Sequence, residues 1–282
     1  MKIRARPGPL GSGPMSLVSI RTFGLFAVTV AALAVSSGAD ALVVRHDVAD
    51  AAYLARESEF PAIFSLYRTR AGHPDCLATL IAPRYALTAA HCTEVKKLRA
   101  AIDSGSGYPV EIAGHANTVV ALIVPPARVD GSQPDVAVLR LGSTAVGITP
   151  ITPYAMSDEV GRIVLMPGWG GTGTGKTGAG PSDGLFRVAE NRVDRAENGR
   201  LYWMFDDPAA GRALTLEGIS GPGDSGGPAL MRTANGWAVV GVSSAQRNGD
   251  GPEGVYGVEE VFVRVSDLAG WIERILRSGG SG

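Results

Sequence analysis

The sequence is poor in cysteine, with only Cys76 and Cys92 among its 282 residues. Two cysteines cannot complete a tetrahedral zinc site by themselves. His91 adjoins Cys92, but neighbouring residues on a strand or turn usually point apart, so we predict no metal site. An even pair of cysteines in an exported chain favours a disulfide, which would stabilise the fold by roughly 3 kcal/mol.

The chain also carries almost no net charge, because its 26 Lys and Arg residues nearly balance its 27 Asp and Glu residues. A formal charge of -1 gives no electrostatic reason to expect nucleic acid or an anionic membrane as a partner. Hydrophobic residues make up 45% of the chain and charged residues 19%, which excludes a fibrous or disordered protein. The composition is that of a globular protein.

The apolar run near the N-terminus, Phe23–Val35, is too short to span a membrane comfortably. It is followed by Ala39-Asp40-Ala41, an A-x-A cleavage pattern, and no acidic residue precedes Asp40. The basic residues that precede the run are Lys2, Arg4, Arg6 and Arg21. These features predict a signal peptide over residues 1–41, with an uncleaved anchor as the alternative.

Translation would begin at Met1 or at Met15, since a signal starting at Met15 has a more ordinary length. Cleavage after Ala41 would leave a mature chain that begins at Leu42. We expect this chain to be secreted, extracellular or periplasmic, without stable membrane association.

From Phe60 onward, short apolar runs are separated by Gly, Pro, Asn and Asp. Their lengths and spacing indicate strands, and their number indicates an all-β barrel or sandwich. The runs are Ala62–Tyr67, Ala78–Ile81, Tyr85–Ala90, Thr118–Val124, Val136–Leu141, Arg162–Met166, Leu185–Val188, Leu201–Phe205, Ala229–Arg232, Trp237–Ser243 and Glu260–Val265.

Two local patterns complete the secondary-structure prediction. Asn235-Gly236 between two apolar runs predicts a hairpin with a type I′ turn. Apolar residues at helical spacing predict a C-terminal helix that packs on the second barrel, with Ser266 as its candidate N-cap. These apolar residues are Leu268, Trp271, Ile272, Ile275 and Leu276.

The stretch Gly170–Thr177 fits the phosphate-binding pattern G-x-x-x-x-G-K-[ST]. A phosphate loop must open a helix whose N-terminus holds the anion. The following residues, 178–184, are rich in glycine and contain a proline, so they cannot propagate a helix. We therefore predict a flexible loop and no nucleotide binding.

The stretch Gly223-Asp224-Ser225-Gly226-Gly227-Pro228 carries the clearest chemistry. A serine followed by two glycines suits a tight, exposed loop whose backbone N–H groups converge on one point. Acyl transfer needs such a loop, because a hydroxyl nucleophile must lie beside two donors for the oxyanion. His91 would supply the base, and Asp135, at the start of an apolar strand, would fix its tautomer.

These segments resemble the trypsin/chymotrypsin family of serine proteases, whose triad also follows the order His, Asp, Ser. The matching motifs are TAAHC at 88–92, DVAVLRL at 135–141, GWG at 168–170 and GDSGGP at 223–228. The resemblance covers about residues 60–276 and implies an all-β fold of two packed six-stranded antiparallel barrels. The implied divisions are an N-terminal segment 42–59, barrels at roughly 60–150 and 151–265, a helix at 266–276 and a tail at 277–282.

The resemblance implies a role for each matching residue. Ser225 would be the nucleophile, His91 the general base and then acid, and Asp135 the residue that orients His91. The N–H groups of Gly223 and Ser225 would form the oxyanion hole. The spacing of Cys76 and Cys92 matches the family's bridge beside the histidine, and a single disulfide is compatible with a bacterial-type member.

The implied function is a secreted serine endopeptidase that hydrolyses peptide bonds through an acyl-enzyme intermediate. We expect a monomer that acts on polypeptides and needs no cofactor. The alternative is a protease-like binding or regulatory module whose cleft is blocked by the segment 43–59 or by the glycine-rich loop.

The chain departs from the family at its expected N-terminus. Family members are commonly activated by cleavage before Ile-Val-Gly-Gly, after which the new α-amino group pairs with the aspartate before the serine, here Asp224. No such sequence occurs in this chain. We hypothesise that removal of the signal frees the amine of Leu42 for this pairing, since a buried carboxylate needs a partner.

The residues expected to select the substrate also depart from the family. Ile219 stands where trypsin-like members carry an aspartate for Arg and Lys, and Ser220 is a neutral polar neighbour. Glu260 aligns with a small residue of the pocket wall. If Glu260 points inward, a basic or mixed preference follows; if it points outward, we expect an apolar or aromatic one, which we favour slightly. Ser244 would help to pair with the substrate backbone.

Overall fold

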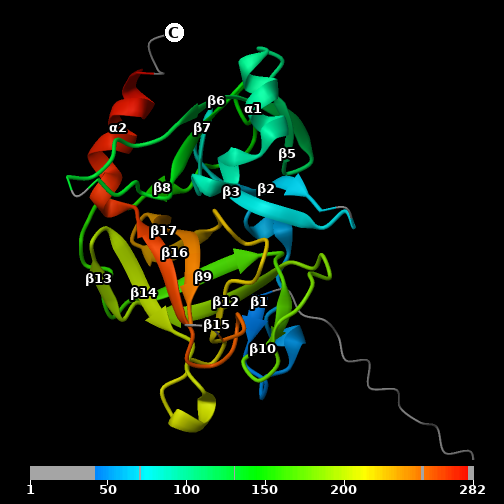
Figure 1. The fold of residues 1–282 in the computed structure, drawn as a ribbon, viewed down its shortest axis with the longest axis vertical. Helices are drawn as coiled ribbons and strands as arrows, with labels where there is room; N and C mark the ends of the chain where they lie inside the picture. The colour runs from blue at the N-terminus through cyan, green and yellow to red at the C-terminus, as the bar shows by residue number, and fades with distance from the viewer. Residues whose placement is uncertain (1–41, 70, 130, 249–250, 279–282) are drawn as a thin grey trace, which may run out of the picture. The chain divides into compact units, whose positions relative to one another are not determined.

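The computed structural model describes residues 42–69, 71–129, 131–248 and 251–278 (Figure 1). The predicted signal peptide, residues 1–41, and the last four residues of the predicted tail lie outside these ranges. None of the helices in the described ranges combines the length and apolar character needed to cross a bilayer.

The first large sheet has six antiparallel strands, in the order β2-β3-β4-β7-β6-β5. Its edge strands β2 and β5 also contact each other, so the sheet curls toward closure, as the barrel prediction requires. The strands are β2 (Ile63–Arg68), β3 (Pro74–Ala82), β4 (Tyr85–Thr88), β5 (Tyr108–Ile112), β6 (His115–Ile123) and β7 (Ala137–Leu141).

The second large sheet follows the order β12-β9-β16-β17-β18-β14-β13, and β8 adds to β17 in parallel. The sheet therefore has eight strands, two more than the six of the expected barrel. The strands are β8 (Thr152–Pro153), β9 (Ile163–Gly168), β12 (Arg187–Arg192), β13 (Arg195–Glu197), β14 (Arg200–Met204), β16 (Pro228–Thr233), β17 (Gly236–Arg247) and β18 (Glu259–Arg264).

A small third sheet joins the N-terminal segment to the glycine-rich stretch, in the order β11-β10-β1-β15. It consists of β1 (Leu42–Val44), β10 (Thr172–Thr174), β11 (Gly178–Ala179) and β15 (Gly218–Ile219). The prediction of a flexible loop at Gly170–Thr177 was wrong, because this stretch forms the β10–β11 hairpin. The strand β11, rather than a helix, therefore follows the phosphate-loop pattern.

The helices differ from the prediction in two ways. The helix α1 (Lys96–Asp103) was not predicted, and α2 (Ala269–Ser278) begins after a 3-10 turn, Ser266–Leu268. Ser266 is not an N-cap, because its hydroxyl donates instead to Glu159 at 2.6 Å. The other 3-10 turns are Asp50–Ala52, Glu57–Glu59, His91–Glu94 and Pro208–Ala210.

The predicted hairpin between β16 and β17 is confirmed, but its turn is not type I′. Thr233 pairs with Gly236, which leaves Ala234 and Asn235 between the strands. A type I′ turn requires positive φ at both central residues, whereas positive φ occurs here only at Gly236, at 110°. The glycine therefore begins the second strand instead of completing the turn.

One buried cluster draws on both large sheets, with Leu77 and Leu87 from the first and Leu230 and Val239 from the second. Ile272 of α2 belongs to this shared cluster, so the helix covers apolar surface of more than the second sheet alone. Burial of this continuous apolar surface is the main force that holds the two sheets together.

Candidate active site

His91 and Asp135 come together because they sit at the ends of two paired strands. His91 begins the turn after β4, Asp135 precedes β7, and β4 and β7 are antiparallel with Thr88 opposite Ala137. The Nδ1 atom of His91 lies 2.8 Å from Oδ2 of Asp135, and the backbone N–H of His91 donates to Oδ1 at 2.9 Å. These two contacts hold the Asp135 carboxylate against His91.

His91 and Asp135 each shift the pKa of the other. The hydrogen bond to Asp135, which outweighs partial burial, raises the pKa of His91 above its ordinary value. Burial alone would raise the pKa of Asp135, but hydrogen bonds from His91 and from the Ser244 hydroxyl, at 2.7 Å, lower it. Asp135 is therefore ionised at neutral pH and holds the Nδ1 proton of the imidazole.

The Ser225 loop packs directly against the strand that carries Cys76. Leu77 donates its N–H to the carbonyl oxygen of Ser225 at 2.7 Å, and Sγ of Cys92 lies 3.5 Å from the same oxygen. Gly226 has a φ of 78°, and a Cβ there would lie 2.3 Å from Oγ1 of Thr88. The close approach of loop and strand therefore requires glycine at this position.

The N–H groups of Gly223 and Ser225 have no acceptor among the described residues, so both are available to a ligand. Gly223 adopts a φ of 103°, a conformation that favours glycine. Within the same described ranges, the Ser225 hydroxyl makes no hydrogen bond to His91. Catalytic hydrogen bonds are often long before a substrate binds.

Asp224 is buried beneath the loop, with 3% of its surface exposed. Its Oδ1 accepts the N–H groups of Trp169 at 3.0 Å and Gly170 at 2.7 Å, and its Oδ2 accepts that of Gly221 at 3.0 Å. Burial outweighs these bonds and raises the pKa of Asp224 to about 7. No cation pairs with this carboxyl in the part of the chain that the structure describes.

The strand β1 begins beside the segments that hold this buried carboxyl. Leu42 pairs with Thr172 in parallel, and Val43 pairs with Ile219 in the antiparallel sense. Going backward from Leu42, the neighbouring strands therefore lead toward Gly170 and Gly221, two of the residues whose amides hold Asp224. Leu42 is almost completely buried, with 1% of its surface exposed.

The predicted disulfide between Cys76 and Cys92 is confirmed. Sulfur atoms of these residues and the imidazole of His91 lie within 4.8 Å of one another. Both sulfurs are bonded to each other, however, so neither is a thiolate that could ligate a metal. The disulfide connects the turn at His91 to β3, the strand whose Leu77 donates to the Ser225 carbonyl.

Glu260 lies in the protein interior beside Ser220. It has no exposed surface, and its carboxyl accepts the N–H of Ser220 at 3.1 Å and also the Ser220 hydroxyl. Gln246, opposite Glu260 in the β17–β18 pair, donates to the Ser220 carbonyl at 2.6 Å. Ile219 is fully buried beside β1.

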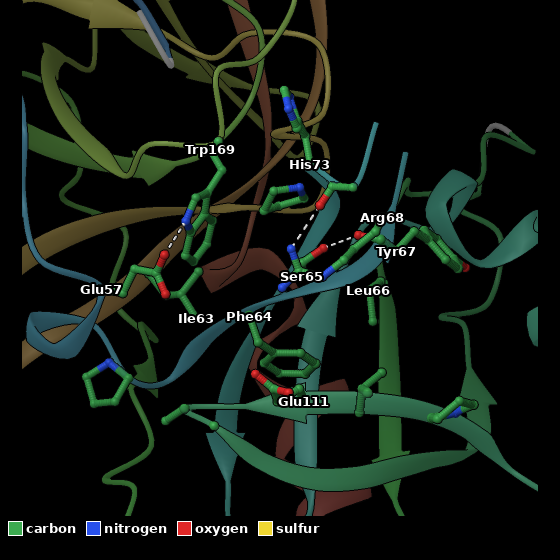
Figure 2. Close-up of a pocket in the computed structure, with 18 of the residues that line it drawn as sticks. Glu57, Ile63, Phe64, Ser65, Leu66, Tyr67, Arg68, His73, Glu111 and Trp169 are labelled. Atoms are coloured by element: carbon green, nitrogen blue, oxygen red, sulfur yellow. Dashed lines mark hydrogen bonds between the residues drawn. The ribbon is translucent and has the colours of Figure 1, made fainter. Parts of the chain in front are cut away.

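A groove of about 1000 Å³ lies beside Trp169, between the N-terminal segment and the first large sheet (Figure 2). Trp169 lines it and also donates its backbone N–H to Asp224. Figure 2 shows the Trp169 indole N–H directed at Glu57, at 2.9 Å. The predicted N-terminal segment thus supplies one wall of the groove, while β2 supplies the other, including Phe64 and Tyr67.

The family model described as Trypsin matches residues 52–272. The chain belongs to the trypsin family. Serine protease SP24D of Anopheles gambiae is 29% identical over 79% of this chain and 79% of its own length. CLIP domain-containing serine proteases B15 of Anopheles gambiae and HP8 of Bombyx mori are 26% and 27% identical over 72% and 70% of this chain. The chain spans only 62% and 60% of those two relatives.

Two features of this trypsin-family site were missed by the sequence analysis. Gln246 was not named, although it follows Ser244 by two residues and so shares one side of an extended strand. The hydrogen bond from the Trp169 indole to the Glu57 carboxylate was also missed, because the two residues lie 112 positions apart in the chain. The alternation within β17 was the signal that could have found Gln246.

Proposed function

We propose that the chain is a secreted serine endopeptidase in which Ser225, His91 and Asp135 form the catalytic triad. The observation that carries this proposal is the pairing of His91 Nδ1 with Asp135 Oδ2 at 2.8 Å beside the Ser225 loop. Membership of the trypsin family and the names of the matched serine proteases support it.

The proposed reaction uses the triad and the two backbone N–H groups of the Ser225 loop. His91 Nε2 takes the proton of Ser225 Oγ as the oxygen attacks the peptide carbonyl, and Asp135 stabilises the imidazolium. The N–H groups of Gly223 and Ser225 stabilise the oxyanion. His91 then protonates the leaving amine, and water releases the acyl group in the reverse sequence of steps.

We further propose that the mature chain begins at Leu42 and that its α-amino group pairs with Asp224. The register of β1 and the cation-free burial of Asp224 support this assignment. Leu42 also has a φ of 65°, which costs an L-residue about 1–2 kcal/mol. Cleavage before Leu42 removes the preceding carbonyl and with it the clash that makes this conformation unfavourable.

The groove beside Trp169 is a candidate site for the leaving side of a polypeptide. Pro74 lines the groove, and its carbonyl oxygen lies 3.5 Å from the point that a Cβ on Gly223 would occupy. Its lining combines aromatic and charged side chains, which suits an extended peptide. Trp169→Ala would then weaken binding of substrates that extend beyond the leaving amine.

One observation favours the alternative of a binding module, namely the missing hydrogen bond between Ser225 and His91 in the described ranges. A fluorophosphonate probe separates the two, because only an activated serine is phosphonylated. We would measure intact mass before and after labelling in wild type and in Ser225→Ala. One adduct in wild type and none in the variant supports the enzyme.

The starting mass in the same experiment identifies the N-terminus. Absence of an adduct on a folded chain that begins at Leu42 would contradict the proposal and favour the binding module. Absence of an adduct on a longer chain would indicate an unprocessed precursor, which must be retested after removal of the residues before Leu42.

A further inference from the structure

The position of Ser220, Gln246 and Glu260 decides what can lie next to Ser225 on the acyl side of a substrate. These three residues, which we call the Ser220 cluster, lie between the Ser225 loop and the end of β17. Gly226 donates its N–H to the Ser243 carbonyl at 3.0 Å, and Ser243 donates to Gly227 at 2.9 Å. Loop and strand are therefore tied together close to the nucleophile.

An acyl group on Ser225 must extend into the space between these two segments. Its carbonyl is fixed by the N–H groups of Gly223 and Ser225, while Ser244, from β17, contacts Asp135 on the opposite side. A side chain placed between the two segments would meet Ser220 on one and Gln246 on the other, which are in direct contact. The free volume between these two residues sets the size of side chain that fits.

The Ser220 cluster bridges the two segments. Gln246 crosses from β17 and donates its amide to the Ser220 carbonyl at 2.6 Å, and it also lies 3.5 Å from Oε2 of Glu260. Gly254 holds the other end of the amide, donating its N–H to Oε1 of Gln246 at 3.1 Å. The Gln246 amide is thus held by hydrogen bonds at both its nitrogen and its oxygen.

Glu260 closes the inner end of the space. Its carboxyl has no exposed surface and no cationic partner within the described ranges, and its hydrogen bonds come from Ser220 and Gln246. Burial, with the nearby charge of Asp224, raises the pKa of Glu260 to about 8. At neutral pH the group is therefore a neutral acid that does not attract a cation.

We infer that the Ser220 cluster plugs the acyl-side pocket, so that this enzyme cleaves after small residues such as Gly, Ala and Ser. The inference rests on the proposed function and adds a substrate class to it. An arginine, lysine or aromatic side chain would have to displace Gln246 and break its bonds to Ser220. Without Gln246, the carboxyl of Glu260 would instead become accessible to a basic side chain.

The test uses peptide substrates that differ only in the residue before the scissile bond, Ala, Phe or Arg. For wild type, kcat/KM should be about 10-fold or more higher with Ala than with Phe or Arg. In Gln246→Gly, kcat/KM with Arg should rise about 10- to 100-fold. The double variant Gln246→Gly/Glu260→Gln should lose this gain, since the carboxyl that pairs with Arg is gone.

Arg247→Gly is the matched control, because it removes the neighbouring, exposed side chain of the same strand and should leave the preference for Ala intact. Each variant is also labelled with the fluorophosphonate probe, which does not depend on the acyl-side residue. A labelled wild type that prefers Arg or Phe overturns the inference while leaving the proposed function standing. So does a labelled, folded Gln246→Gly that gains nothing with Arg. Failure of wild type to label overturns both.

Discussion

Asp135 and Asp224 are two carboxyls of one site, and their surroundings differ in every respect. Asp135 is partly exposed and bonded to the side chain that it serves, and its pKa is lowered. Asp224 is buried and bonded only to backbone amides, and its pKa is raised to about 7. The first carboxyl is therefore paired with His91 of its own half and with Ser244 of β17, whereas the second has no cationic partner among the described residues.

The difference teaches how the two halves of the site are built. His91 and Asp135 are brought together by the pairing of β4 with β7 within a single sheet, and Ser244 of β17 adds one hydrogen bond. The Ser225 loop depends on Asp224, and through it on the third sheet, where β1 from the start of the described chain meets β10 and β15. We therefore expect the His91 half to be insensitive, and the Ser225 half sensitive, to the state of the N-terminus.

The largest effect is expected from Asp135→Asn. An amide donates to Nδ1 and stabilises the wrong tautomer of His91, so kcat should fall about 10⁴-fold with little change in stability. Steady-state hydrolysis of a peptide substrate checks this, with Asp103→Asn on the exposed end of α1 as the control. A fall of less than tenfold would show that Asp135 does not orient the base.

A smaller effect is expected when two residues, Gly-Ser, precede Leu42 in the mature chain. The α-amino group can then no longer reach Asp224, and loss of a buried ion pair should lower kcat/KM about 10²- to 10³-fold. The His91 Nδ1 proton, observed by NMR, should keep its resonance because its half of the site does not contain β1. The same two residues added after Gly282 serve as the control, and unchanged activity of the N-terminal extension sinks the pairing.

The disulfide lies within the His91 half and adjoins the other half, since the Cys92 sulfur lies 3.5 Å from the Ser225 carbonyl oxygen. The double variant Cys76→Ala/Cys92→Ala should lose about 3 kcal/mol of unfolding free energy, because the 16-residue loop is no longer closed. Urea denaturation measures this loss. Wild type reduced with dithiothreitol should show a similar loss, and equal stability of all forms would refute the prediction.

The smallest effect is a shift of the pH dependence. His91 must be neutral to accept the Ser225 proton, and its raised pKa places the acid limb of kcat/KM above the ordinary value of 6.5. Activity should fall as the pH drops through that limb. In Ser225→Ala, NMR titration of the imidazole should give the same raised pKa, and adding Asp135→Asn should lower it. A rate that stays flat from pH 5 to 8 contradicts the assignment of His91 as base.

Local patterns were sufficient for much of the fold and for the residues of the site. The apolar runs predicted most of the long strands, because alternation and turn residues act over a few positions. They did not predict β1 or β15, whose few residues become strands only because β1 pairs with both β10 and β15. The helix α1 was missed as well, since the apolar face that it buries comprises little more than Leu98.

The sequence by itself determined the disulfide and the candidate triad residues Ser225, His91 and Asp135, because each stands in a recognisable short segment. Only the tertiary structure decided where Glu260 points, since that depends on the register of β18 against β17 and on the bulge beside Ser244. It also decided that Gln246 reaches Ser220 and that β1 begins beside the two segments whose amides hold Asp224. Such contacts join residues far apart in the chain, and a one-residue change of register would turn the same side chains to the opposite face of the sheet.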